Sequence, residues 1–190
     1  MNRKIKTVAV YCGHQFGNNP EYARDAHKVG EMLARNKMTL VFGGGNVGLM
    51  GTVASAAIEN GGKVMGISTK HVVSLQEPAH KDIDVKVVNG LSTRKEQMFN
   101  LSDAFVILPG GIGTLDEMTD IMTKQQVGES YKPIYMLNTA KYWEIFGQVM
   151  THMQAEGFMR SADDYNLHVV NSPEELIQRL IDCDDFVTTC

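Results

Sequence analysis

Residues 102–118, SDAFVILPGGIGTLDEM, give the clearest indication of how this chain folds. They contain a continuous apolar run, Ala104 to Leu108, of the kind that forms a strand buried on both faces of a parallel sheet. The turn PGGIGT follows, and a helical pattern then runs from Leu115 to about Val127. Strand, glycine-rich turn and helix in this order are typical of a βαβ unit. Because this run is the most apolar of the chain, we expect it to form the central strand.

The same alternation extends in both directions along the chain. We expect further strands at residues 7–12, 39–42, 64–67, 84–88, 132–137 and 168–170. We expect further helices from Pro20 onward and at residues 49–60, 92–100, 142–155 and 172–183, with a less regular segment at 68–81. Pro20 suits a helix start, Gly61 with Gly62 a helix end, and Ser172 a capping position. The pattern predicts an α/β, Rossmann-like, doubly wound and mainly parallel sheet with helices on both faces, and a single nucleotide-binding domain over residues 1–190.

Composition excludes several classes of function. With 43% hydrophobic and 21% charged residues the chain is typical of globular proteins, and its net charge of -4 argues against binding to nucleic acid or to an anionic membrane. No stretch approaches the roughly 20 apolar residues of a membrane helix, and the apolar stretch near the N-terminus is too short for a signal peptide. Three widely spaced cysteines suit a reducing compartment. We therefore expect a cytoplasmic protein.

Three glycine-bearing loops, at residues 13–19, 43–51 and 110–114, follow predicted strands. In open α/β sheets ligands bind beyond the carboxyl ends of the strands, where glycine lets the backbone approach an anion and the next helix offers free N–H groups. The loops therefore predict a phosphate site, against the alternative that their glycines only make tight turns. GGGNVG follows the second strand without a clear acidic ribose anchor, and no GK[ST] occurs, so neither a standard nicotinamide dehydrogenase nor a P-loop ATPase fits.

Two charged residues are candidates for chemistry at this site. Glu117 lies about one turn into the helix after PGGIGT, where it either serves the ligand or completes a capping box with Thr114, and the pattern does not decide between them. Arg94 precedes the central strand, and its planar guanidinium matches phosphate oxygens, although a solvated surface charge is the alternative. His14, His71 and His80 lack the spacing of metal ligands, so no metal is expected.

The motifs GGGNVGLMG, STRKEQM, SDAFVILPGGIGTLDEM and KPIYMLN together resemble the LOG ("Lonely Guy") family over essentially the whole chain. Members are cytokinin riboside 5′-monophosphate phosphoribohydrolases, often mislabelled as lysine decarboxylases. The resemblance implies a Rossmann-like homodimer without a cofactor that hydrolyses the N-glycosidic bond of a nucleoside 5′-monophosphate. The products would be a free base and ribose 5-phosphate. Nothing in the sequence singles out a lysine for pyridoxal phosphate, which a decarboxylase would need.

The resemblance also implies roles for individual residues. Arg94 and Glu117 match the family's catalytic arginine and glutamate. The expected phosphate site comprises Gly110, Gly111, Gly113 and Thr114. The rest of the nucleotide pocket is expected from Gly44, Gly45, Gly48 and Met50, with Met98 and Asp103 as neighbours. Met118, Ile121 and Met122 could supply an apolar face for this dimer, although methionine is also an ordinary core residue.

Two departures from relatives bear on the substrate. The first loop reads CGHQFG where many relatives have CGSS, and Lys124 stands where plant relatives have tryptophan. Both changes could alter the base preference, so plain AMP is a candidate substrate beside a cytokinin nucleotide. A non-catalytic nucleotide sensor or carrier is the alternative function. Such a protein would need the glycine loops but not Arg94 and Glu117 together.

Overall fold

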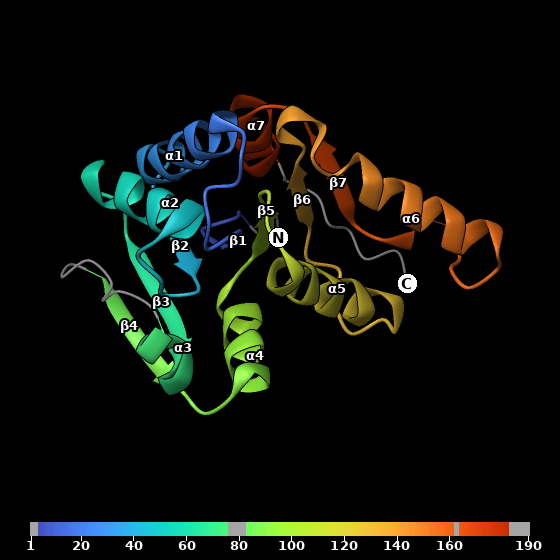
Figure 1. The fold of residues 1–190 in the computed structure, drawn as a ribbon, viewed down its shortest axis with the longest axis horizontal. Helices are drawn as coiled ribbons and strands as arrows, with labels where there is room; N and C mark the ends of the chain where they lie inside the picture. The colour runs from blue at the N-terminus through green and yellow to red at the C-terminus, as the bar shows by residue number, and fades with distance from the viewer. Residues whose placement is uncertain (1–3, 76–82, 162–163, 183–190) are drawn as a thin grey trace.

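The computed structural model describes residues 4–75, 83–161 and 164–182, and its strands form one seven-stranded sheet (Figure 1). The strands are β1 (Thr7–Tyr11), β2 (Thr39–Phe42), β3 (Val64–Thr69), β4 (Asp84–Val88), β5 (Ala104–Ile107), β6 (Ile134–Leu137) and β7 (Leu167–Val170). Their order across the sheet is β4-β3-β2-β1-β5-β6-β7, and each recorded pairing is parallel. The predicted α/β doubly wound sheet is confirmed.

One detail of the expected sheet is wrong. The middle strand is β1, with three strands on each side, and β5 lies next to it. The chain first winds outward from β1 to β4 and then returns to the other side of β1 with β5, so the first strand takes the centre. Both strands are buried on both faces, which is why apolar content alone did not distinguish them.

Seven helices and one 3-10 turn connect and follow these strands in the described part of the chain. They are α1 (Pro20–Arg35), α2 (Gly48–Glu59), α3 (Lys70–Leu75), α4 (Leu91–Leu101), α5 (Ile112–Gln126), η1 (Thr139–Lys141), α6 (Glu144–Ala155) and α7 (Pro173–Asp182). The expected starts at Pro20 and after Ser172 are confirmed, with side-chain caps from Asn19 and Ser172. The less regular segment contains α3, and residues 76–82 and Cys183 lie outside the described residues.

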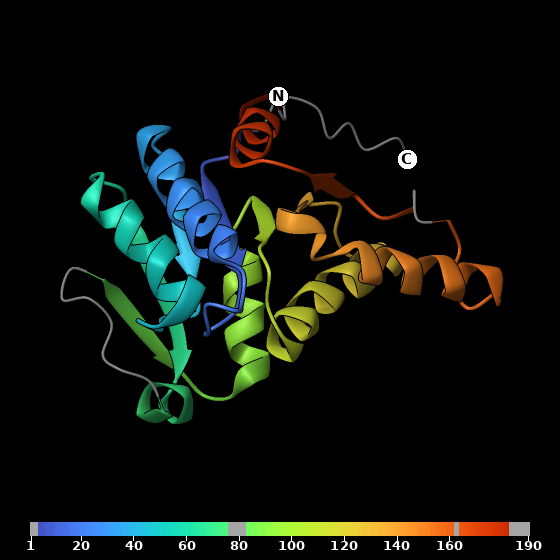
Figure 2. The same ribbon diagram turned by 45° about the horizontal axis from the view of Figure 1, so that its top comes forward.

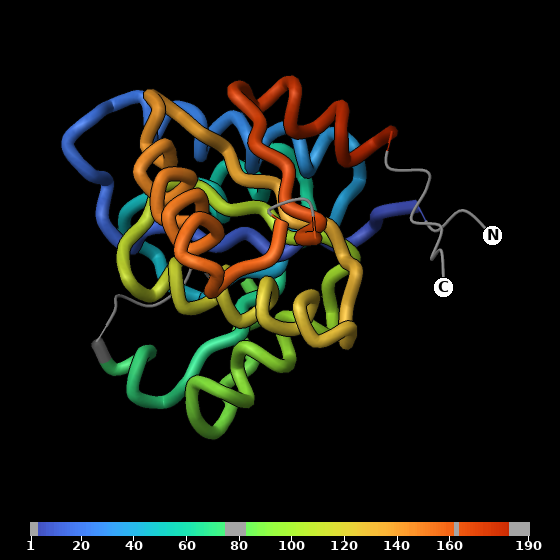
Figure 3. Tube along the Cα trace, turned by 90° about the vertical axis from the view of Figure 1, so that its right-hand side faces the viewer, coloured from blue at the N-terminus to red at the C-terminus, as the bar shows by residue number. Residues whose placement is uncertain are grey.

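Alternate residues of each strand divide the core into two layers. On β1, Val8 and Val10 pack with α1, α2 and α7, whereas Ala9 and Tyr11 pack with α4, α5 and α6. Figure 3 shows α1 and α7 on one side of the sheet and α4 and α5 on the other. Such burial on both faces is expected of a central parallel strand.

The apolar side of α5 belongs to this core. Met118, Ile121 and Met122 are buried against the sheet, so the predicted dimer face at these residues is wrong. The alternative, that these side chains fill the core, is confirmed: their helical spacing forms the apolar stripe with which α5 covers the sheet. Within the described ranges, no helix is long and apolar enough to cross a bilayer.

Candidate active site

The candidate site lies beyond the carboxyl ends of the neighbouring strands β1 and β5. Strands β2 to β4 lie on one side of β1 and strands β5 to β7 on the other, so the order of the strands reverses at this point. The loops after β1 and β5 touch there, because the N–H of Gly13 donates to the carbonyl of Pro109 at 3.0 Å. A cavity of about 450 Å³ opens at this point, a size within the range of small-molecule sites. Doubly wound sheets bind ligands at this switch point. The described residues lining the cavity are Cys12–Gly17, Tyr22, Leu49, Met50, Val72, Arg94, Pro109–Thr114, Glu117 and Tyr142.

The loop after β5 places the start of α5 at one wall of the cavity. The helix begins at Ile112 with Gly111 as its N-cap, three residues before the predicted Leu115. All four residues of the expected phosphate site, Gly110, Gly111, Gly113 and Thr114, line the cavity. The first-turn N–H groups of a helix have no intrahelical acceptor and lie at the positive end of its dipole. This wall can therefore hold an anion.

Gly110 is fixed by its neighbours, whereas Gly111 and Gly113 face open space. A side-chain methyl group at Gly110 would overlap the hydroxyl of Thr114 and approach the amide nitrogen of Gly13 to 2.9 Å. No atom lies within 4 Å of such a group at Gly111 or Gly113. Close packing thus requires glycine at the first position, while the other two leave room for a ligand.

The loop after β2 lies beneath the cavity and shapes it through Met50. Of the expected pocket residues here, Met50 lines the cavity, while Gly44, Gly45 and Gly48 are buried behind it. The N–H of Gly45 donates to Sδ of Met50 at 3.3 Å, and the N–H of Met50 donates to the carbonyl of Gly13 at 3.2 Å. The first bond ties Met50 to the loop after β2, and the second ties it to the loop after β1.

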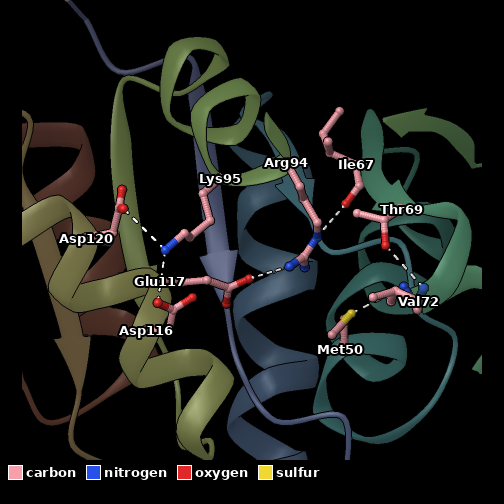
Figure 4. Close-up of polar contacts among 10 residues, drawn as sticks. Met50, Ile67, Thr69, Val72, Arg94, Lys95, Asp116, Glu117 and Asp120 are labelled. Carbon is pink, nitrogen blue, oxygen red and sulfur yellow. Dashed lines mark hydrogen bonds and ion pairs between the residues drawn. The ribbon is translucent and has the colours of Figure 1, made fainter. Parts of the chain in front are cut away.

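The Arg94 side chain extends from α4, past the carboxyl end of β3, to Glu117 on α5 (Figure 4). Its Nε donates to the carbonyl of Ile67 at the end of β3 at 3.0 Å, and Nη1 lies 2.9 Å from Oε1 of Glu117. The guanidinium passes directly over Gly43, where a methyl group would overlap Nη2. Its side chain is only 11% exposed, so the alternative of a solvated surface charge is wrong.

Glu117 is a buried carboxylate and does not cap the helix. Because α5 starts at Ile112, Thr114 is the third helical residue and not the N-cap, so the capping-box interpretation is wrong. The Glu117 side chain is 10% exposed, and its carboxylate pairs with Arg94. Burial raises the pKa of Glu117 above its usual value, and the charge and hydrogen bond of Arg94 lower it part of the way.

Lys95, next to Arg94 on α4, takes part in a second ion-pair group beside the first. Its Nζ lies 2.9 Å from Oδ1 of Asp116 and 3.3 Å from Oδ1 of Asp120 (Figure 4). Burial lowers the pKa of this ammonium, but its hydrogen bonds and charge interactions with both carboxylates outweigh that effect and raise it. The two adjacent cations thus point to different carboxylates, and only the Arg94–Glu117 pair lines the cavity.

Three residues considered from the sequence lie away from the cavity lining. Met98 is one turn beyond Arg94 and fully buried in the core. Asp103 precedes β5, at the opposite end of the sheet, where its carboxylate accepts from the N–H groups of Lys6 and Thr7. Lys124 lies near the other end of α5, with its Nζ 5.3 Å from the centre of the Phe99 ring.

Sequence reasoning missed aromatic residues at the rim and one glycine below Arg94. Tyr142 and Tyr22 line the cavity, with ring centres 5.5 Å apart. Tyr142 follows the motif KPIYMLN. Nothing in the sequence indicated that its hydroxyl would donate a hydrogen bond to the carbonyl of Gly110 in the loop after β5. Gly43 belongs to the glycine motif that was recognised, but its contact with Arg94 depends on the packing of α4.

Cys12 lines the cavity but is a poor nucleophile, because burial raises the pKa of its thiol. Among the described residues, no group of three or more histidine, cysteine, aspartate or glutamate side chains could hold a metal ion. The cavity therefore combines a helix N-terminus, an arginine and a buried carboxylate, a set suited to holding a phosphate next to a developing positive charge.

Comparison with protein families gives one matching model, described as "Possible lysine decarboxylase", over residues 50–180. A cytokinin riboside 5′-monophosphate phosphoribohydrolase of Rhodococcoides fascians is 38% identical over 158 residues, covering 83% of this chain and 80% of the relative. A phosphoribohydrolase of the same name from Arabidopsis thaliana is 33% identical over 179 residues, covering 94% of this chain and 84% of the relative.

Solved structures with the same fold include proteins that bind the molybdenum cofactor. The molybdenum cofactor binding protein of Rippkaea orientalis has a TM-score of 0.67 at 24% identity and covers 95% of this chain and 99% of its own. The molybdenum cofactor carrier protein of Chlamydomonas reinhardtii has a TM-score of 0.67 at 19% identity, covering 94% and 98%. At these identities the likeness concerns the fold alone.

Proposed function

This chain belongs to the LOG family of hydrolases, and we propose that it cleaves the N-glycosidic bond of a nucleoside 5′-monophosphate to give a free base and ribose 5-phosphate. One observation carries the proposal. Arg94 and Glu117 form a buried ion pair in the cavity that also contains the N-terminus of α5. A protein that only carried or sensed a nucleotide would need the helix end but not this pair.

The proposed chemistry assigns a part to each group. The 5′-phosphate is held by backbone N–H groups around Gly110, Gly111, Gly113 and Thr114. Breaking the bond between C1′ and the base leaves positive charge on the ribose, and the Glu117 carboxylate stabilises that charge or orients the attacking water. The water oxygen bonds to C1′ as the C1′–N bond breaks. One of its protons stays on the new C1′ hydroxyl of ribose 5-phosphate, and the other passes to the nitrogen of the departing base. Arg94 positions the substrate and holds Glu117 in place.

The lining of the cavity also bears on the substrate. Phe16, Leu49, Met50, Val72 and Ile112 give it an apolar part on which a base or a prenylated base could lie. The described lining residues include no lysine, so they do not supply the Schiff-base group through which pyridoxal phosphate acts. We therefore propose AMP or a cytokinin riboside monophosphate as the substrate, and we do not propose a decarboxylase activity.

We also propose that the enzyme works as a homodimer in the cytoplasm. The resemblance to the LOG family implies the dimer, and an exposed apolar stripe on α6 supports it: Ile145, Val149 and Met153 are four residues apart and 70%, 41% and 45% exposed. The three cysteines support a reducing compartment, since Cys12 is a buried free thiol.

Chromatography of the purified protein after incubation with AMP or with isopentenyladenosine monophosphate tests the reaction. We expect the wild type to release base and ribose 5-phosphate, and Glu117→Ala to do so about 100- to 1,000-fold more slowly, because one group that stabilises the transition-state charge accounts for a rate factor of this order. Asp116→Asn is the matched control, since this neighbouring carboxylate pairs with Lys95 outside the cavity and its loss should leave activity near that of the wild type.

Two outcomes would contradict the proposal. Full activity in Glu117→Ala would remove the mechanism. Tight binding of either nucleotide without release of base would instead support a carrier or sensor. The relative rates on the two nucleotides rank the substrates.

A further inference from the structure

A backbone turn after β6 is held in a strained conformation next to the cavity. Ala140 and Lys141 have φ of 48° and 63°, two consecutive residues with side chains in the left-handed region. This region is unfavourable for residues other than glycine, and strain of this kind is found mostly where surrounding structure enforces it, often at functional sites.

Contacts on both sides of the turn enforce its conformation. Oγ1 of Thr139 donates to Oδ2 of Asp25 on α1 at 2.6 Å. Asn138 donates its N–H to the carbonyl of Val170, and its Oδ1 accepts from the N–H of Trp143 at 2.8 Å. Thr139 and Trp143 are both buried. These contacts fix the chain immediately before and after Tyr142, the residue that follows the turn.

The ring of Tyr142 is also held in place. It makes edge contacts with Tyr22, at 5.5 Å between ring centres and 76° between planes, and with Trp143, at 4.9 Å and 87°. In this orientation its hydroxyl donates to the carbonyl of Gly110 at 2.6 Å. That carbonyl belongs to the loop that precedes α5.

The bond to Gly110 determines which way the loop presents its amides. In a planar trans peptide the C=O and N–H groups point in opposite directions, so fixing the carbonyl of Gly110 fixes the N–H of Gly111. Gly110 is already confined on its other side by Thr114 and by the amide nitrogen of Gly13. The bond from the Tyr142 hydroxyl therefore favours one orientation of the peptide between Gly110 and Gly111.

From this geometry we propose that Tyr142 is a positioning residue that orients the amides of residues 111–113 for the phosphate of the ligand. The strained turn at Ala140 and Lys141 serves to bring its hydroxyl to Gly110. This inference rests on the proposed function, because it takes the loop at the start of α5 to be the phosphate site. Tyr142 acts through the loop and is not assigned a part in bond cleavage.

Tyr142→Phe removes the hydroxyl and keeps the ring contacts, so the variant should fold as the wild type does. We expect its Kd for AMP and for ribose 5-phosphate to rise roughly 3- to 10-fold, the loss that corresponds to one hydrogen bond, with an unchanged Kd for adenosine. KM for AMP should rise by the same factor while kcat changes less. Tyr131→Phe is the matched control, because Tyr131 is exposed and lies outside the described cavity lining.

Hydrogen exchange of the ligand-free protein provides a second measurement. The peptide covering residues 109–115 should exchange faster in Tyr142→Phe than in the wild type or in Tyr131→Phe. Unchanged AMP affinity together with unchanged exchange would overturn the inference. An equal loss for AMP and adenosine would overturn it too, since it would place the hydroxyl on the sugar or base.

The binding measurements also separate this inference from the proposed function. If the wild type binds AMP more tightly than adenosine but releases no base, the hydrolase proposal fails, and the comparison with Tyr142→Phe still tests the loop. If the wild type shows no preference for phosphate-bearing ligands, the phosphate site and the role of Tyr142 both fail.

Discussion

At the residue scale, the candidate site depends on an ionised group in a buried position. Glu117 is confined between α5 and α4, and desolvation there disfavours its charged form. Arg94, whose Nη1 lies 2.9 Å from the carboxylate, offsets part of this cost. A buried pair of this kind contributes little to stability by itself, so we interpret the Arg94–Glu117 pair as a functional feature of the cavity.

The raised pKa of Glu117 gives a prediction for stability against pH. Because the folded-state pKa lies above that of the unfolded chain, the carboxyl group binds its proton more tightly when folded. The free energy of unfolding of the wild type relative to Glu117→Gln should therefore rise as pH falls through the folded-state pKa and stay constant above it. Urea denaturation of both proteins over a pH series measures this difference. A fall toward acid pH would mean that Arg94 dominates and that the pKa is lowered.

Gly43→Ala tests the position of Arg94 without changing either charged residue. The added methyl group would overlap Nη2 of Arg94, the flexible end of a side chain, so the guanidinium should move while the fold remains. We expect kcat/KM for the nucleotide to fall about 10-fold or more, since displacements of about 1 Å in an active site have such effects. Gly147→Ala in α6 is the control, because its methyl group meets no atom within 4 Å. Equal activities of the two variants would contradict the role of Gly43.

At the element scale, α1 and α2 end in the same way with different residues. After α1 the N–H of Met38 donates to the carbonyl of Leu33 and that of Lys37 to Ala34. After α2 the N–H groups of Gly62 and Gly61 donate to Ala57 and Ile58 in the same pattern, which is the Schellman motif. The left-handed position holds Gly61 in one helix, with φ of 72°, and Lys37 in the other, with φ of 57°.

Lys37→Gly should therefore stabilise the protein. Glycine adopts the left-handed conformation without the strain that a side chain causes, and we expect a gain of about 0.5–1 kcal/mol in the free energy of unfolding. Urea or thermal denaturation measures it. Lys37→Ala is the control for the loss of the exposed side chain and should give no such gain. In Gly61→Lys the free energy of unfolding should fall by a comparable amount. If neither Lys37→Gly nor Gly61→Lys changed the free energy of unfolding, the left-handed conformation would carry no measurable strain at these positions.

The sequence predicted these elements well but not their exact ends at the site. The strands and helices were recognisable from apolar periodicity, and Pro20, Ser172 and Gly61 marked helix ends through local backbone chemistry. The start of α5 was misplaced, because Gly111 and Ile112 do not carry a capping signal. That shift of three residues is what made the capping box of Thr114 and Glu117 credible.

At the scale of the whole molecule, the site follows from the order of the strands. The order β4-β3-β2-β1-β5-β6-β7 brings the loops at Gly13 and Gly110 together, although about 100 residues separate them. Sequence pattern alone could place each loop at the carboxyl end of its strand. It could not show the link between Tyr142 and Gly110 or the passage of Arg94 over Gly43, because both depend on how helices from different βαβ units pack.

The exposed stripe on α6 leads to a prediction about assembly. Figure 2 shows α6 at the end of the sheet where β7 lies, away from α1 and α2. Ile145, Val149 and Met153 share one face because they are four residues apart, and water in contact with such a stripe is unfavourable. Since Tyr142 directly precedes this region and lines the cavity, a second copy bound to the stripe would border the site. Dimerisation through α6 would thus be coupled to substrate binding.

Analytical ultracentrifugation over a range of concentrations tests this dimer. The wild type should sediment as a dimer, and Ile145→Glu should sediment as a monomer, because a carboxylate buried in an apolar contact without a partner costs several kcal/mol. Ile181→Glu on α7 is the matched control, since Ile181 is 38% exposed on the opposite layer and should leave the dimer intact. A monomeric wild type, or dimers in both variants, would remove α6 as the contact. If Ile145→Glu is a monomer and also binds AMP more weakly, the second copy helps to close the cavity.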